Sequence, residues 1–315
     1  MLKKIIMGGV FSLLLAEILV LSGCGVSNQK TINTDNAEKI KVAATIYPLY
    51  DIVKIVGGDK IIPILILPPG ASPHTFSASP AQIKEAQGSR LFFTIGGEVD
   101  NWAKDIENVI DGVQTVELNQ FLQLKPFGSA NSNHISLDAP APGDIKADLD
   151  PHTWLDPNNA EMMAKKISSY LEKIDATNKD YYEINTQNFI ANLKSKDQEW
   201  QDKLKNLTKK DLVVFHDAWG YFADHFGLHI AGAFEPFPGK SPTPQYLINL
   251  QAIVKKNNIT ALFIEPQLSK EAIITLAGDL KLKINVLDPL GGIDERNNYI
   301  NMIDYNINNI YEALK

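Results

Sequence analysis

Hydrophobic and polar positions alternate in blocks along most of this chain. Short runs rich in Ile, Val, Leu and Phe are separated by longer segments whose apolar residues recur at helical spacing. The predicted strands are residues 40–46, 61–67, 91–95, 212–215, 261–264 and 284–287. Continuous apolar strands separated by helices are typical of parallel sheets that are covered on both faces. The pattern therefore predicts an α/β fold.

One segment departs from this alternation. No Gly or Pro occurs between Asn158 and Trp219, and the apolar residues in the middle of this segment follow a helical stripe. A helix over residues 178–206 would be about 40 Å long. It could be a surface helix of a single domain. Because strands and helices alternate on both sides of it, we expect a rigid connection between an N-terminal lobe, 39–177, and a C-terminal lobe, 207–315.

The N-terminus has the pattern of a secretory signal. Lys3 and Lys4 precede an apolar stretch that ends in the run Leu-Ser-Gly-Cys at Cys24. A positive start, an apolar stretch and small residues before a cleavage site mark such a signal. The final run resembles a bacterial lipobox, which implies that residues 1–23 are removed and that Cys24 is lipidated. The alternative, a membrane-spanning anchor, is disfavoured because the stretch is short and contains Glu17.

Residues 24–38 then form a polar segment with little to bury, which predicts a flexible tether. The expected location is outside the cytoplasm, on the cell membrane. Cys24 is the only cysteine, so the mature chain cannot contain an internal disulfide. The formal net charge of -7 argues against nucleic acid as a partner.

Four residues are candidates for metal binding. His74 follows the strand 61–67, while His216 and Asp288 each follow directly on a predicted strand. In open α/β sheets, ligands bind beyond the carboxyl ends of the strands. His152 lies in a proline-flanked turn before a predicted helix. Imidazole and carboxylate together are ligands of transition metals.

Five stretches of the chain, three of which contain a candidate histidine, resemble one receptor family, the zinc/manganese substrate-binding proteins of bacterial ABC transporters. They are Ala44–Tyr50, Pro69–His74, Asp150–Pro157, Val214–Trp219 and Glu265–Gln267. The resemblance implies two four-stranded α/β lobes, a rigid connecting helix and a metal between the lobes. It also implies delivery of the metal to a membrane permease that is powered by a cytoplasmic ATPase. By position, the family's ligands fall on His74, His152, His216 and Asp288, and we expect a monomer.

Other polar residues compete with this assignment. Glu265 ends another strand, and could be a direct ligand or a partner that orients an imidazole. Asp288 is preferred as the ligand. His225 and His229 are interpreted as structural, because Gly227 is expected to end a helix between them. His134 stands alone in a loop where zinc-binding members of the family often carry many histidines.

Three imidazoles and one carboxylate favour Zn²⁺ as the cargo, because Mn²⁺ prefers more oxygen ligands. Manganese remains the alternative cargo. A zinc hydrolase is the rival class, but it would need an open coordination position and a general base. A surface adhesin on the same fold is a third possibility. Because metal binding requires neutral imidazoles, affinity is expected to fall as the pH drops through about 6.5.

Overall fold

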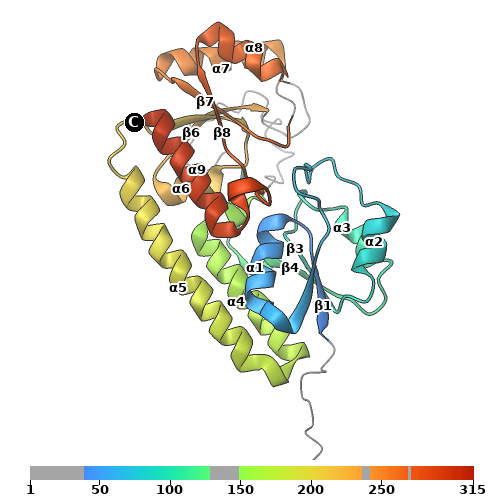
Figure 1. The fold of residues 1–315 in the computed structure, drawn as a ribbon. Helices are drawn as coiled ribbons and strands as arrows, with labels where there is room; N and C mark the ends of the chain where they lie inside the picture. Colours follow the sequence, from blue (N-terminus) through green and yellow to red (C-terminus); the bar gives the residue numbers. More distant parts are fainter. Residues whose placement is uncertain (1–38, 128–148, 236–241, 269–270) are drawn as a thin grey trace, which may run out of the picture. The chain divides into compact units, whose positions relative to one another are not determined.

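Two four-stranded parallel sheets form the framework of the chain, as the pattern of apolar runs predicts (Figure 1). The computed structural model describes residues 39–127, 149–235, 242–268 and 271–315. The predicted signal peptide, Cys24, the tether and His134 lie outside these residues. No helix in the described part is long and apolar enough to cross a membrane.

The first sheet has the strand order β2-β1-β3-β4. Its strands are β1 (Ile40–Ala44), β2 (Ile61–Leu65), β3 (Leu91–Thr94) and β4 (Gln114–Glu117). The second sheet repeats the arrangement in the order β6-β5-β7-β8. Its strands are β5 (Asp211–His216), β6 (His229–Glu235), β7 (Ala261–Ile264) and β8 (Lys283–Val286). The central strands β3 and β7 are buried along their whole length, which explains why they are entirely apolar or nearly so.

Helices cover the sheets and join them. They are α1 (Tyr47–Gly57), α2 (Pro80–Ala86), α3 (Ala103–Glu107), α4 (Pro157–Ile174), α5 (Lys179–Leu204), α6 (Gly220–Phe226), α7 (Pro244–Lys256), α8 (Glu271–Leu280) and α9 (Tyr299–Leu314). Several begin at residues with side-chain caps; Asp156, for example, accepts a hydrogen bond from the backbone N–H of Asn158 at the start of α4. The proline in the first turn of α4 is likewise typical of the start of a helix.

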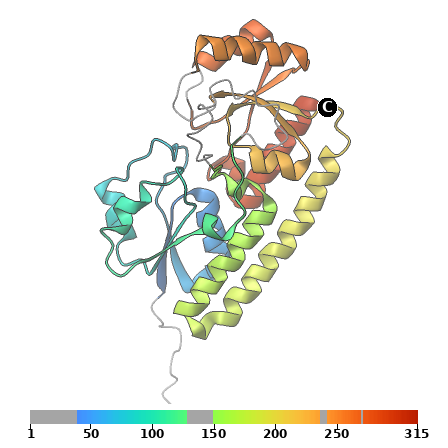
Figure 2. The same ribbon diagram turned by 180° about the vertical axis from the view of Figure 1, so that it is seen from behind.

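The long helix expected from the sequence is α5, with 26 residues. It runs beside α4 along one side of the structure, from the level of the first sheet to that of the second (Figures 1 and 2). Its Asn185 side chain donates to the Val56 carbonyl of α1, and the Trp200 indole donates to Asp304 of α9. The helix is thus tied to elements from both halves of the sequence. Residues 39–315 form one compact unit, and the lobe boundaries stay a prediction.

Two features differ from the expectations. The edge strands β4 and β6 were not among the predicted strands; β4 is short and largely polar, while β6 contains Gly232. The sequence also predicts a helix that begins at Asp217, directly after His216, whereas α6 begins at Gly220. A turn intervenes, in which the Ala218 N–H donates to the His216 carbonyl.

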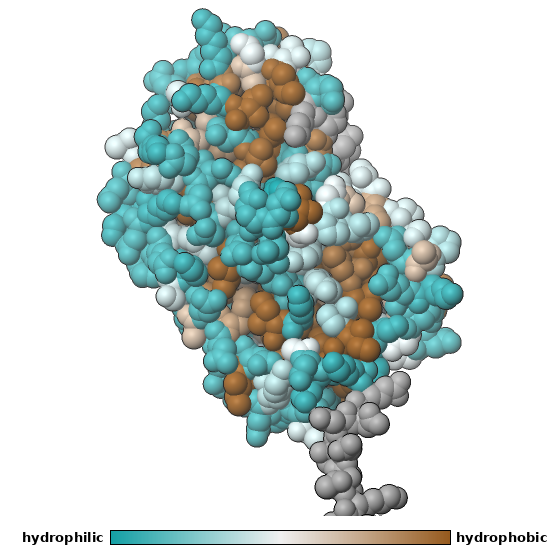
Figure 3. All heavy atoms as spheres, in the orientation of Figure 1, coloured by the Kyte–Doolittle hydropathy of each residue, from teal (hydrophilic) through white to brown (hydrophobic). Residues whose placement is uncertain are grey.

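The surface facing the viewer in Figure 3 is mostly hydrophilic, with one hydrophobic patch in its upper part and others in its middle and lower parts. In the second sheet β8 is an edge strand; its Ile284 is 40% exposed, and Ile274 on α8 is 50% exposed.

Candidate metal centre

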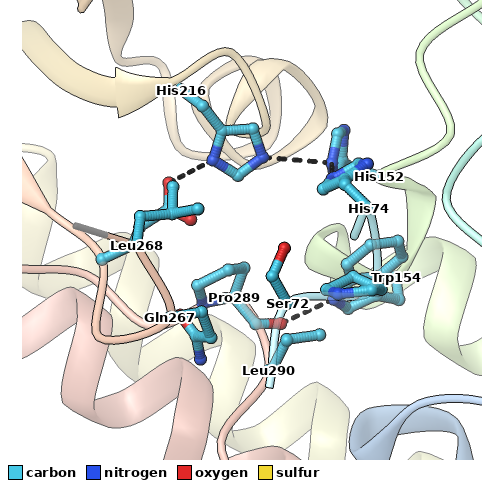
Figure 4. A pocket seen from close by; sticks show the side chains of 11 residues that line it. Ser72, His74, His152, Trp154, His216, Gln267, Leu268, Pro289 and Leu290 are labelled. Atoms are coloured by element: carbon cyan, nitrogen blue, oxygen red, sulfur yellow. Dashed lines mark hydrogen bonds and ion pairs between the residues drawn. The ribbon is translucent and has the colours of Figure 1, made fainter. Parts of the chain in front are cut away.

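Three imidazoles converge between the ends of the two sheets. The Nε2 atom of His152 lies 3.4 Å from Nε2 of His74 and 3.3 Å from Nε2 of His216. One ligand atom from each histidine lies within 4.8 Å of the others, and this is the only such group of three or more His, Cys, Asp or Glu found among the described residues. Figure 4 shows His216 and the pair His74 and His152 around one small pocket.

Each histidine comes from a different kind of local structure. His74 lies in the proline-rich segment after β2, and His216 is the last residue of β5. His152 immediately precedes a short 3-10 turn that leads into α4. The carboxyl ends of parallel strands meet at one edge of a sheet, so strand ends from both sheets can face a common point.

Two of the imidazoles are oriented by buried carboxylates. The Nδ1 atom of His152 lies 2.8 Å from Oδ1 of Asp150, which also accepts the backbone N–H of His152. The Nδ1 atom of His216 lies 2.7 Å from Oε1 of Glu265. A carboxylate on Nδ1 fixes the ring orientation and leaves Nε2 as the free, more basic nitrogen for a metal. The sequence left two roles open for Glu265, a direct ligand or a partner of an imidazole. Its contact with Nδ1 of His216 has the geometry of the second role.

Burial controls the charge of this cluster. It lowers the pKa of His74 to about 2, with the neighbouring His152 and His216 adding to the effect. Burial also lowers the pKa of His152 well below its usual value. For His216 burial acts in the same direction, but the Glu265 carboxylate, together with Asp217 and Asp150, outweighs it and the pKa is raised. Two of the three imidazoles are therefore neutral at pH 7 and ready to bind a cation.

The spacing of the nitrogens matches the requirements of a metal. Two nitrogens bound to one tetrahedral zinc at the usual bond length are about 3.3 Å apart. The two separations in this cluster, 3.3 and 3.4 Å, agree with that value. The Trp154 indole, which donates to the Pro289 carbonyl at 2.7 Å, and Leu290 form apolar walls of the pocket (Figure 4).

Asp288 lies outside the group of three histidines. It is fully buried just after β8, and its neighbours Pro289 and Leu290 line the pocket. Its Oδ2 atom lies 3.1 Å from Nη1 of Arg296. The structure brings together three of the four candidate ligands, and it holds the fourth in an ion pair with Arg296.

Comparison with known proteins agrees with this geometry. The sequence model of a family described as zinc-uptake complex component A, periplasmic, matches residues 42–313. The chain belongs to this family. Members of the zinc-uptake family are solute-binding components of metal ABC transporters, so the chain is a metal-binding transport protein and not an enzyme.

Similar proteins include both zinc and manganese receptors. The chain is 28% identical to the high-affinity zinc uptake system protein ZnuA of Bacillus subtilis (strain 168), over 95% of each chain. It is 27% identical to the manganese ABC transporter substrate-binding lipoprotein PsaA of Streptococcus mitis, over 97% of this chain and 98% of that one. A crystal structure of ZnuA aligns with a TM-score of 0.76 and 25% identity, over 88% of this chain and 100% of that one.

The remaining described histidines lie away from the cluster. The helix α6 ends before Gly227, as expected, and His225 within it forms ion pairs with Asp156 and Asp197. His229 is largely exposed on the edge strand β6. The sequence reasoning did not single out Asp150 or Arg296. The Asp-Pro-His order could have indicated Asp150, whereas no local signal links Arg296 to Asp288.

Proposed function

We propose that this protein captures Zn²⁺ outside the cell membrane and delivers it to an ABC permease powered by a cytoplasmic ATPase. The observation that carries the proposal is the convergence of three Nε2 atoms, two of them backed by carboxylates. Imidazole nitrogens suit zinc better than manganese, and manganese lies at the weak end of the divalent affinity series. A cargo binds here by exchanging its water for a preorganised set of imidazole and carboxylate ligands.

The proposed ligands are His74, His152, His216 and Asp288. Oδ2 of Asp288 is buried and accepts no hydrogen bond among the described residues, and its one charged contact there is the ion pair with Arg296, which a metal ion would have to replace. Glu265 is better suited to orient His216, since its Oε1 atom accepts from both the imidazole and the Trp219 indole. A fourth protein ligand closes the coordination shell, as a carrier without catalytic chemistry requires.

The proposal includes attachment to the membrane through a lipid on Cys24. The support is the lipobox-like run at that residue together with the relatives that are named as lipoproteins. A single mobile anchor would keep the receptor near its permease, which raises the effective concentration of one for the other. We propose that the protein acts as a monomer.

Calorimetric titration of the metal-stripped protein with zinc, followed by competition with manganese, tests the proposed cargo. One tightly bound zinc per chain that excess manganese does not displace is the expected result. Displacement by manganese would overturn zinc as the cargo, and the absence of tight binding would overturn the proposed receptor function. A screen for hydrolysis by the loaded protein should detect no turnover.

A further inference from the structure

The two carboxylate oxygens of Asp288 have different surroundings. Oδ1 accepts three hydrogen bonds, at 3.0 Å from each of the Leu290 and Gly291 backbone N–H groups and at 2.7 Å from the Gln267 side chain. Oδ2 lies 3.1 Å from Nη1 of the Arg296 guanidinium, in an ion pair that lacks the geometry of a hydrogen bond. Oδ1 is anchored, whereas Oδ2 can change its partner.

Arg296 reaches Asp288 because the chain turns back between them. Gly291 and Gly292 adopt the left-handed backbone conformation, and the Gly292 N–H donates to the Arg296 carbonyl. A Cβ atom at Gly291 would lie only 2.8 Å from that carbonyl oxygen. The turn therefore requires glycine, and it fixes a guanidinium beside the carboxylate.

The choice of arginine here is unusual for this chain. The sequence contains only two arginines, Arg90 and Arg296, among 30 basic residues. Arg296 is buried, and its guanidinium stacks over the Tyr305 ring at 4.7 Å. Arginine tolerates such a site because its planar cation is weakly hydrated and cannot lose its charge.

We propose that Arg296 is the counter-ion that the incoming metal displaces from Asp288, which makes Arg296 a positioning residue that sets the affinity of the site. A fully buried carboxylate needs a positive charge beside it, because an unpaired buried charge is strongly unfavourable. Either the guanidinium or the metal supplies that charge. This inference rests on the proposed function, specifically on Asp288 as a ligand.

The exchange has a defined destination for the guanidinium. Nη2 of Arg296 already lies 3.5 Å from Oδ2 of Asp294, a largely exposed carboxylate on the same turn. When Asp288 turns Oδ2 toward the histidines, Arg296 keeps Asp294 as its partner near the surface. The three donors on Oδ1 keep the Asp288 carboxylate close to its place while this happens. The cost of separating Arg296 from Asp288 lowers the net affinity for every cargo.

The two arginines allow a direct test in the unmodified sequence. In protein labelled with ¹⁵N-arginine, a guanidinium held by a buried carboxylate has hindered rotation and resolved Nη signals. We expect the resolved Nη signals of Arg296 in the metal-stripped protein to average on addition of one equivalent of zinc. The exposed Arg90 is the internal control. An Arg90→Lys sample, which keeps only the signals of Arg296, shows which Nη signals belong to each arginine. Persistence of the resolved Arg296 signals in the zinc-loaded protein would overturn the inference.

Zinc affinity provides the second measurement. Arg296→Met leaves Asp288 without its counter-ion in the metal-stripped protein, and the metal then supplies the missing charge. We expect zinc to bind at least about tenfold more tightly to this variant. The gain should vanish when Asp288→Asn is introduced into the same background. A folded Arg296→Met variant with unchanged or weaker zinc binding would contradict the proposal.

Calorimetry on the labelled samples distinguishes a failure of the proposed receptor function from a failure of the proposed exchange of partners. If the wild-type protein binds no zinc tightly, the proposed function fails. If it binds zinc tightly while Arg296 stays in its ion pair, the receptor function stands and only the exchange of partners is wrong. The variant measurements require a circular dichroism spectrum like that of the wild type, whereas the arginine signals of the wild type do not depend on any substitution.

Discussion

His216 and Glu265 share a buried contact of 2.7 Å, at the carboxyl ends of the neighbouring strands β5 and β7. The side chains of both residues are at most 4% exposed. Because the carboxylate holds Nδ1, the Nε2 atom of His216 points toward His152 at 3.3 Å. The register of two strands thus determines the direction in which one ligand presents its nitrogen.

Replacing Glu265 by glutamine should weaken zinc binding by about 10- to 100-fold, because the uncharged amide no longer raises the basicity of the ligand imidazole. The affinity can be measured by competition with a chromophoric chelator. Glu98→Gln, which changes an exposed carboxylate that does not line the pocket of the histidines, is the matched control and should bind normally. Affinity of Glu265→Gln within twofold of the wild type would exclude an orienting role for this carboxylate.

Removing a metal ligand should weaken zinc binding more than removing the carboxylate that orients this ligand. His216→Ala is expected to weaken zinc binding by more than about 100-fold, while the secondary structure of the metal-stripped protein is preserved. Titration calorimetry together with a circular dichroism spectrum checks both parts. His229→Ala is the control, since this histidine is largely exposed on β6. A His216→Ala protein that bound zinc normally would remove His216 from the site.

Zinc binding at pH 7 should release protons, because any proton held by a ligand imidazole must leave. His74 and His152 have lowered pKa values and are neutral, whereas the pKa of His216 is raised, so its proton must leave when the metal binds. The affinity should therefore fall as the pH decreases, beginning above 6.5. Calorimetry in two buffers of different ionisation enthalpy measures the number of protons released. Heats that do not depend on the buffer would contradict the expected release.

The position of the metal cluster could be predicted because its signals are local. His216 ends the largely apolar strand β5, and His152 precedes the cap and proline that begin α4. Each signal depends on a few adjacent residues. The carboxyl edge of a parallel sheet then brings residues distant in sequence close together.

The partners of these residues were less accessible to sequence reasoning. Arg296 meets Asp288 only because two glycines turn the chain back, and nothing in the local pattern indicates which carboxylate it will face. The strand β4 was missed for a related reason. At the edge of the sheet it has a partner on one side only, so polar residues suffice and the apolar run disappears.

A second charged contact joins three helices away from the metal cluster. Nδ1 of His225 in α6 lies 2.9 Å from Asp156 at the start of α4, and Nε2 lies 2.6 Å from Asp197 in α5. Asn158 and Gln201 also face this ring. Burial alone would lower the pKa of His225, but the two carboxylates outweigh it and raise the pKa to about 9. The imidazolium thus ties α5 and α4 to the second half of the chain.

Because the pKa of His225 is higher in the folded state than the usual 6.5, its stabilisation is complete below pH 6.5 and is lost as the pH rises through about 9. The free energy of unfolding should be higher for the metal-stripped wild type than for metal-stripped His225→Gln. This difference between the two proteins should be about 2–3 kcal/mol larger at pH 6 than at pH 10. Urea denaturation of both proteins at several pH values measures this difference, and other titrating groups largely cancel between them. His229→Gln should unfold like the wild type at each pH. A His225→Gln difference that stayed constant from pH 6 to 10 would mean that the ring packs between the helices without carrying a charge.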